Sequence, residues 1–128
     1  MKPNVLLIIA AIYMALLGLA FIFIPQMIGV GAVPTDASAA LIAYLRVFGS
    51  TFIAIGVLNW AARKAEPSTP LNAILLANTV GFGLAALLDL WGALSGGRQL
   101  AWVFVVIHLL FTVAFILLRR MSMASKSS

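Results

Sequence analysis

Four long apolar blocks, separated by short polar connectors, account for most of the chain. They cover residues 5–24, 38–62, 71–94 and 100–118, within about two residues at each end. Each block has about 19 to 25 residues, which at ~1.5 Å per helical residue matches a hydrocarbon layer of ~30 Å. We therefore predict an all-α fold: a single-domain membrane four-helix bundle over residues 1–128, with antiparallel up-down topology.

The connectors contain residues that commonly begin or end helices. Pro25 is expected to end the first helix, and Ser95-Gly96-Gly97 the third. The connector after the third helix is so short that the third and fourth helices must form an antiparallel hairpin. Residues 121–128 are expected to form a polar tail. N-cap candidates precede the second and third helices: Thr35, Asp36 and Thr69, the last followed by Pro70 at the first helical position.

Composition supports a membrane protein. Hydrophobic residues make up 64% of the chain and charged residues 9%, against roughly 45–50% and about 25% in soluble domains. The absence of cysteine excludes disulfide frameworks, Cys-ligated zinc and iron–sulfur centres. The net charge is +5, but the charged residues lie mostly between the apolar blocks. A role in membrane orientation therefore explains them better than binding to nucleic acid does.

The distribution of Lys and Arg predicts the orientation. If the N-terminus is cytoplasmic, six basic residues lie inside and only Arg98 lies outside. The six are Lys2, Arg63, Lys64, Arg119, Arg120 and Lys126. We therefore predict a multi-pass protein of the bacterial inner membrane with both termini in the cytoplasm. Gly18-x-Ala20 resembles a signal-peptide cleavage site, but the apolar run continues past it, so we expect the first helix to be retained.

Three of the predicted spans each contain one strongly polar residue. Arg46 is expected about 12 Å, Asp89 about 8 Å and His108 about 12 Å below the outer boundary. Because a charge costs about 2.5–3.5 kcal/mol at a helix centre, these residues are expected to face protein or water and to pair. We predict a cluster in the outer half of the membrane, in which Arg46 pairs with Asp89 and His108 hydrogen-bonds to one of them.

Helical spacing adds further residues to this cluster. Asn78 shares a helix face with Asp89, and Tyr13 in the first span needs a partner for its hydroxyl group. Small residues in the spans would let neighbouring helices approach closely. The predicted packing residues are Gly49, Ser50 and Gly56 in the second span and Ala85 in the third.

Two interpretations of the cluster stay open. Its contacts either fix how the helices pack, or form the polar end of a pocket for a small ligand or proton. His108 is also considered as an axial ligand for haem or chlorophyll magnesium, but the chain has no second histidine for a bis-ligated haem. No catalytic motif or metal-binding pattern is present, so we predict no catalytic residue, no metal and no cofactor.

The segments Leu45-Arg46-Val47-Phe48-Gly49 and Ala54-Ile55-Gly56-Val57-Leu58 resemble the DoxX-like group of small bacterial four-helix membrane proteins. Leu87-Leu88-Asp89-Leu90-Trp91-Gly92, with the hairpin leading to His108, is similar to uncharacterised relatives of that group. The resemblance implies a four-helix membrane fold, with Arg46, Gly49 and Gly56 as the matching positions. It also implies a role as a subunit of a quinone-linked oxidoreductase, as in some members.

These observations favour a non-enzymatic membrane protein that functions by association, as an accessory subunit or a homo-oligomer. Four spans in 128 residues give a thin bundle with much lipid-facing surface. The alternatives are a binding or transport module for a small amphiphile, lipid or quinone, and an oxidoreductase subunit that takes its cofactor from a partner. The expected partners are the lipid bilayer and other membrane subunits or copies of this chain, not nucleic acid.

Overall fold

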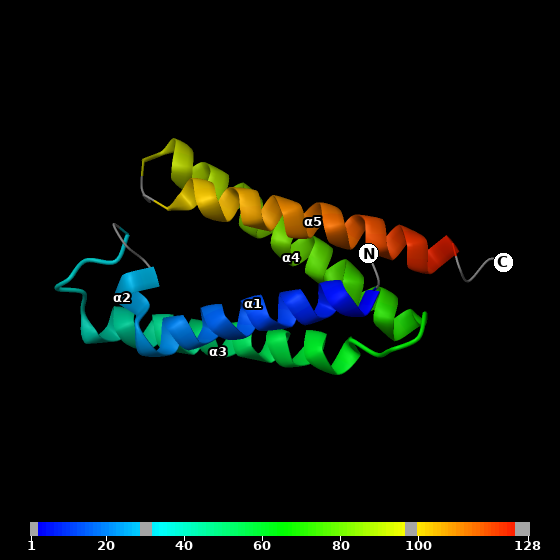
Figure 1. The fold of residues 1–128 in the computed structure, drawn as a ribbon. Helices are drawn as coiled ribbons and strands as arrows, with labels where there is room; N and C mark the ends of the chain where they lie inside the picture. Colours follow the sequence, from blue (N-terminus) through cyan, green and yellow to red (C-terminus); the bar gives the residue numbers. More distant parts are fainter. Residues whose placement is uncertain (1–2, 29–31, 97–99, 125–128) are drawn as a thin grey trace.

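The computed structural model describes residues 3–28, 32–96 and 100–124, which fold into helices and connecting loops without a strand. The long helices are α1 (Pro3–Phe23), α3 (Ala39–Ala62), α4 (Thr69–Leu94) and α5 (Ala101–Ala124), and the short α2 (Pro25–Ile28) follows α1. All four long helices are long and apolar enough to cross a membrane. The expected all-α four-helix fold is confirmed (Figure 1).

The bundle consists of two antiparallel helix pairs. α1 packs mainly against α3, and α4 mainly against α5, while the two pairs contact each other much less. Figure 1 shows the α4–α5 pair inclined to the α1–α3 pair, so that the pairs approach each other where α3 leads into α4. We call this the terminal end, because α1 begins and α5 ends there. The opposite end is called the α2 end.

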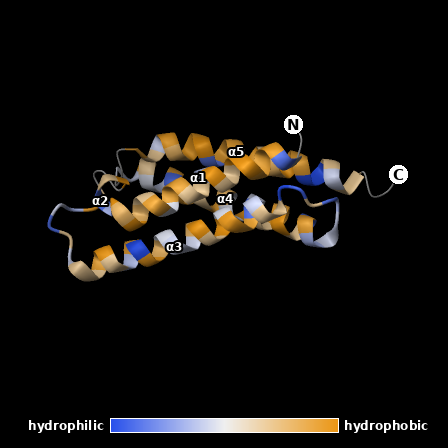
Figure 2. Cartoon of the chain, turned by 60° about the horizontal axis from the view of Figure 1, so that its bottom comes forward, coloured by the Kyte–Doolittle hydropathy of each residue, from blue (hydrophilic) through white to orange (hydrophobic). Residues whose placement is uncertain are grey.

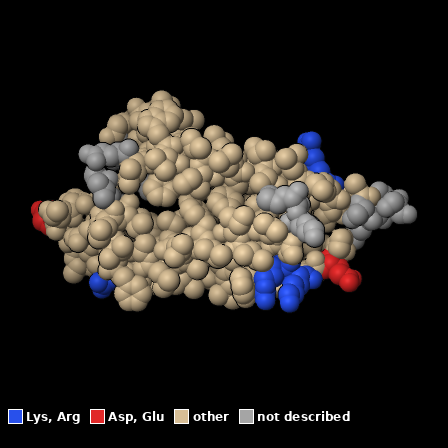
Figure 3. All heavy atoms as spheres, viewed as in Figure 1, with Lys and Arg blue, Asp and Glu red and all other residues tan. Residues whose placement is uncertain are grey.

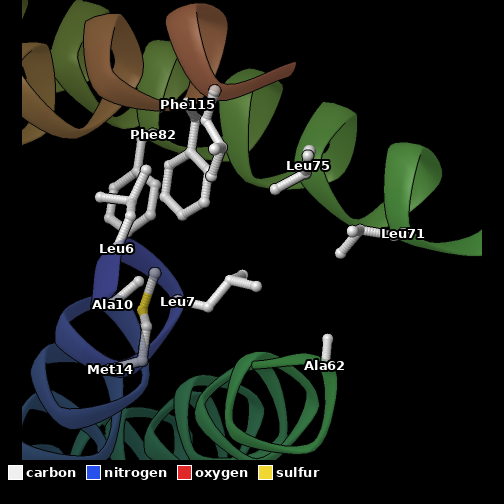
Figure 4. Close-up of a cluster of buried hydrophobic side chains, with 10 residues drawn as sticks. Leu6, Leu7, Ala10, Met14, Ala62, Leu71, Leu75, Phe82 and Phe115 are labelled. Atoms are coloured by element: carbon white, nitrogen blue, oxygen red, sulfur yellow. The ribbon is translucent and has the colours of Figure 1, made fainter. Parts of the chain in front are cut away.

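The apolar core lies toward the terminal end. Figure 4 shows side chains from all four long helices meeting there, because the antiparallel order brings the starts of α1 and α4 to the ends of α3 and α5. Lipid tails are as apolar as these side chains, so close packing rather than removal from water holds the helices together. The buried cluster contains Leu6, Leu7, Ala10, Met14, Ala62, Leu71, Leu75, Phe82, Phe115 and Leu118.

The four long helices consist mostly of hydrophobic residues, as Figure 2 shows, and many of their large apolar side chains are exposed. Large side chains such as Tyr44, Phe23 and Leu94 are more than two-thirds exposed. The three tryptophans, Trp60, Trp91 and Trp102, are exposed near helix ends, as in the aromatic belts of membrane proteins. Such a surface suits contact with lipid or with further membrane helices.

Two helix starts differ from the predicted ones. The N-cap of α3 is Ser38, whose hydroxyl oxygen accepts from the Leu41 amide at 3.2 Å, rather than Thr35 or Asp36. The N-cap of α4 is Ser68 rather than Thr69, and its hydroxyl oxygen accepts from the Leu71 amide at 3.3 Å. Serine is among the best N-cap residues, so the shift of a few positions keeps the same chemistry.

The helix ends agree with the prediction at two points and differ at one. α1 ends at Phe23, just before Pro25, and Gly96 follows α4 with a φ of 69°, a left-handed conformation that glycine adopts readily. α5, however, continues to Ala124, so residues 121–124 are helical rather than part of a polar tail. Gly97 and residues 125–128 lie outside the described residues.

Candidate functional site

His108 joins the two helix pairs through its two ring nitrogens. Its Nδ1 lies 2.7 Å from Oδ2 of Asp89 on α4, and its Nε2 lies 2.8 Å from the hydroxyl oxygen of Tyr13 on α1. Asp89 and His108 are only 8% and 9% exposed, and Tyr13 is partly buried. We call these three residues the histidine network. Because it connects α1, α4 and α5, it spans both helix pairs.

The hairpin formed by α4 and α5 explains why Asp89 meets His108. At ~1.5 Å per residue, Asp89 lies about 8 Å before the end of α4 and His108 about 11 Å after the start of α5. The two helices are antiparallel neighbours, so these residues lie at similar levels and face each other. Tyr13 lies near the middle of α1 and approaches His108 from the other helix pair.

The hydrogen-bonding capacity of each group limits where the protons of the network can lie. An ionised carboxylate only accepts hydrogen bonds, so Nδ1–H of His108 donates to Asp89. In a neutral ring, Nε2 then accepts from the Tyr13 hydroxyl; in a charged ring, Nε2–H donates to the Tyr13 oxygen. Both protonation states keep both contacts. The network therefore holds the helices together whether or not His108 carries a charge.

Aromatic rings surround the histidine. The centroids of Phe82 and Phe104 lie 5.8 Å and 6.0 Å from that of the His108 ring, and Phe111 stacks on Phe82 at 4.4 Å. Tyr13 itself packs against Phe111 at 5.1 Å between centroids. An apolar environment of this kind strengthens hydrogen bonds, and it also makes an unpaired polar group costly. Leaving either ring nitrogen of His108 without a hydrogen-bond partner would therefore be costly in this environment.

Asn78 belongs to a second polar contact, which links α3 to α4. Its side-chain nitrogen donates to Oδ1 of Asn59 at 2.7 Å and to the Ile74 carbonyl oxygen at 2.9 Å, and its Oδ1 accepts from Asn59 at 3.0 Å. Both amides are buried. Asn78 was predicted to belong with Asp89, and Asn59 was not predicted, although an amide within an apolar span is itself a signal for an interhelical hydrogen bond.

A third polar contact lies within the α4–α5 pair. Nε of Arg119 donates to Oδ1 of Asn72 at 2.9 Å, and both residues are partly buried. This contact lies near the terminal end and was not predicted from the sequence. Together, the three contacts connect α1 to α5, α3 to α4 and α4 to α5.

Arg46 does not pair with Asp89, so the predicted ion pair is wrong. Nε of Arg46 donates to the carbonyl oxygen of Ile22 at 3.2 Å and the residue is exposed, whereas Asp89 binds His108. Because α1 ends at Phe23, the Ile22 carbonyl is among those that lack an intrahelical amide partner. A cation at a helix C-terminus satisfies such a carbonyl and is favoured by the helix dipole. Arg46 therefore stabilises the end of α1.

Glycines allow α1 and α3 to approach closely. A Cβ atom added at Gly49 would lie 2.7 Å from the Gly18 carbonyl oxygen, and one added at Gly18 would lie 2.7 Å from the Gly49 carbonyl oxygen. A Cβ atom at Gly56 would lie 3.0 Å from the Ala11 carbonyl oxygen. Gly49 and Gly56 thus lie in a helix contact, whereas the packing role of Gly18 was not predicted.

The other two predicted packing residues are placed differently. Ser50 is exposed, and its hydroxyl group donates to the Val47 carbonyl oxygen of its own helix at 2.6 Å. It therefore faces away from the α1–α3 contact. Ala85 is partly buried on α4, beside the buried Ala86. Of the four small residues, Gly49 and Gly56 are the two at which backbones come close together.

The arrangement is closed rather than open toward a ligand. Among the described residues, no buried side-chain nitrogen or oxygen lacks a hydrogen-bond partner, and no group of three His, Cys, Asp or Glu residues could hold a metal ion. A haem iron or chlorophyll magnesium at Nε2 of His108 would have to displace the Tyr13 hydroxyl group. Chemically, the network can hold the helices together and accommodate a proton.

Comparison with known proteins adds no relative, because no protein-family model, curated protein or solved structure matches the chain.

Proposed function

We propose that this chain is a non-enzymatic protein of the bacterial inner membrane that functions by association, as an accessory subunit or a homo-oligomer. In this proposal, the histidine network fixes the α4–α5 pair relative to the α1–α3 pair, so that the bundle presents a defined apolar surface to its partners. The observation that carries the proposal is the double engagement of His108, which binds Asp89 within its own pair and Tyr13 in the other.

The closed state of the network supports a structural role. A binding or catalytic site normally directs donors or acceptors toward the place of the ligand. In the described part of the chain, the buried polar atoms are instead directed toward one another. Interhelical hydrogen bonds in membrane proteins average about 0.6 kcal/mol, so the contacts select one packing arrangement without dominating the total stability.

The uneven burial of the four helices supports association. Only 11% of the apolar window of α3 is buried inside the bundle, against 33% for α1 and α5 and 28% for α4. A groove of about 100 Å³ lies between α3 and α4, and a Cβ atom added at Gly81 in this groove would meet nothing within 4 Å. Small residues at a lipid-facing groove let another helix approach closely. This side of the bundle is the best candidate for contact with a partner or a second copy.

The charge distribution supports the proposed orientation. Figure 3 shows most of the visible Lys and Arg side chains at the terminal end, where α3 leads into α4 and α5 ends. Arg63, Lys64, Arg119 and Arg120 lie in this region of the chain. By the positive-inside rule, the terminal end faces the cytoplasm and the α2 end faces outward.

A binding module for a small amphiphile such as a quinone is the second candidate. An apolar groove of about 250 Å³ lies between α1 and α5, and Phe111, which lines it, packs against Tyr13. In this candidate, the apolar tail of the quinone lies in the groove beside the Phe111 ring. This candidate fits the quinone-linked activity implied by the DoxX-like resemblance, and membership of that group remains part of the proposal.

Replacement of His108 separates the two candidates. We expect His108→Ala to lower the stability of the purified protein in lipid nanodiscs and to weaken its association, measured by native mass spectrometry. Leu109→Ala, at an exposed position on the same helix, serves as the control and should change neither property. Binding of a short-chain quinone is measured in parallel by tryptophan fluorescence. Wild-type stability and association in His108→Ala, combined with lost quinone binding, would contradict the first candidate and favour the second.

A further inference from the structure

Arg46 carries a charge on the apolar surface of a candidate membrane span. It lies in the span Ala39–Ala62 and is exposed. Its Nε–H is used by the Ile22 carbonyl oxygen, and no carboxylate of the described residues forms an ion pair with it. An arginine in a bilayer is costly unless it reaches the headgroups or pairs with an anion. Arg46 is therefore expected to reach the headgroup region or to pair with an anion.

The contact with Ile22 fixes the level of the guanidinium group. α1 has 21 residues, which at ~1.5 Å per residue gives ~31 Å, close to the ~30 Å thickness of the hydrocarbon layer. Ile22 is the penultimate residue of α1, so its carbonyl oxygen lies near one edge of that layer. The guanidinium group of Arg46 is therefore held near the boundary with the phospholipid headgroups at the α2 end.

The same contact also orients the guanidinium group. Arginine has five N–H donors in a planar fork, and Nε–H is only one of them. With Nε–H directed at Ile22, the two Nη groups remain for another acceptor on the exposed side. Two parallel N–H donors match two oxygens of a phosphate group.

A surface groove lies further along the α1–α3 pair and begins on α3 at Ile53, about 10 Å from Arg46 along the helix axis. The groove has a volume of about 240 Å³, and its lining on α3 includes Ile53, Val57 and Trp60. These residues follow Arg46 at 7, 11 and 14 positions, which places them on the same face of α3 as Arg46. On α1, Ala15 lies seven positions before Ile22 and shares its face. The groove thus lies on the same side as the Arg46–Ile22 contact and is almost wholly apolar.

We propose that Arg46 and this groove together bind one phospholipid of the leaflet at the α2 end. The Nη groups of Arg46 donate to the phosphate, and an acyl chain lies in the groove over Gly56 toward Trp60. The recognised chemistry is a phosphate oxyanion attached to an apolar chain. A free phosphate ion would use the same Nη donors but would leave the groove empty. An acyl chain in the groove therefore distinguishes a bound phospholipid from a bound phosphate ion.

Native mass spectrometry of the protein released from nanodiscs tests the phosphate contact. We expect wild type to retain one phospholipid, and Arg46→Gln to lower the retained fraction about fivefold, the effect typical of one basic residue at a lipid surface. Arg46→Lys, which keeps the charge but not the fork, should fall between them. Lys64→Gln, which removes an exposed cation at the terminal end, should bind like wild type. Equal retention in wild type and Arg46→Gln would overturn the proposal.

Quenching of Trp60 tests the position of the acyl chain without changing Arg46. In a background with Trp91→Phe and Trp102→Phe, Trp60 is the only tryptophan and lines the groove. We expect phospholipid with a brominated chain to quench Trp60 more strongly than brominated diacylglycerol at the same mole fraction, because only the former has a phosphate. Equal quenching by the two lipids, or displacement of the phospholipid by millimolar inorganic phosphate, would overturn the assignment to a phospholipid.

Discussion

Removal of one hydroxyl group tests the link between the two helix pairs. Tyr13→Phe deletes the oxygen that lies 2.8 Å from Nε2 of His108. The ring remains and keeps its packing against Phe82 and Phe111, whose centroids lie 6.2 Å and 5.1 Å away. The substitution therefore removes the polar contact between α1 and α5 while leaving the apolar contacts in place.

The expected loss of stability follows from the burial of His108. Interhelical hydrogen bonds in membrane proteins contribute about 0.6 kcal/mol on average and up to about 1.7 kcal/mol. A buried group left without its partner costs about 1–3 kcal/mol, and His108 is only 9% exposed. We therefore expect Tyr13→Phe to lower the free energy of unfolding by about 1–2 kcal/mol, where 1.4 kcal/mol is about a tenfold change in the equilibrium.

The assay is reversible unfolding in lipid–detergent mixtures, followed by circular dichroism or by steric trapping. Tyr44→Phe is the matched control, because Tyr44 is 74% exposed and makes no hydrogen bond within the described part of the chain. This control should stay within about 0.5 kcal/mol of wild type. If Tyr13→Phe were as stable as Tyr44→Phe, the polar link between the helix pairs would have no energetic role.

Two further sets of substitutions test the other helix contacts with the same assay. Gly49→Ala places a Cβ atom 2.7 Å from the Gly18 carbonyl oxygen and should lower the free energy of unfolding by about 1–3 kcal/mol. Gly81→Ala meets nothing within 4 Å and should be neutral or slightly stabilising; equal losses in both variants would contradict the close contact. Asn78→Leu leaves Asn59 unpaired and should cost about 1–3 kcal/mol, whereas adding Asn59→Leu should recover part of the loss. Strictly additive losses would show that the two amides are not coupled.

The sequence predicts the four long helices because the requirement for about 20 consecutive apolar residues is local. The exact starts are harder to predict. Ser38 and Ser68 each stand within three residues of another good N-cap residue, and local chemistry does not choose between them. The end of α5 was placed too early, because the apolar pattern stops near Leu118 while the helix continues to Ala124 through polar residues.

The polar site was only partly predictable, for reasons of geometry. Asp89 and His108 were expected at similar levels because a short hairpin fixes the register of the two helices that carry them. The partner of Arg46 could not be found from the level of its Cα atom, since its long side chain extends toward the end of α1. The contact between Tyr13 and His108 depends on how one helix pair is inclined to the other, which periodicity within a single helix does not encode.

Nitrogen-15 NMR of the imidazole ring in nanodiscs tests the central claim most directly. His108 is the only histidine of the chain, so labelled histidine reports on this ring alone. We predict that Asp89→Asn shifts chiefly the Nδ1 resonance and Tyr13→Phe chiefly the Nε2 resonance, because each variant changes the partner of one nitrogen. If both resonances kept their wild-type positions in both variants, His108 would not connect the two helix pairs.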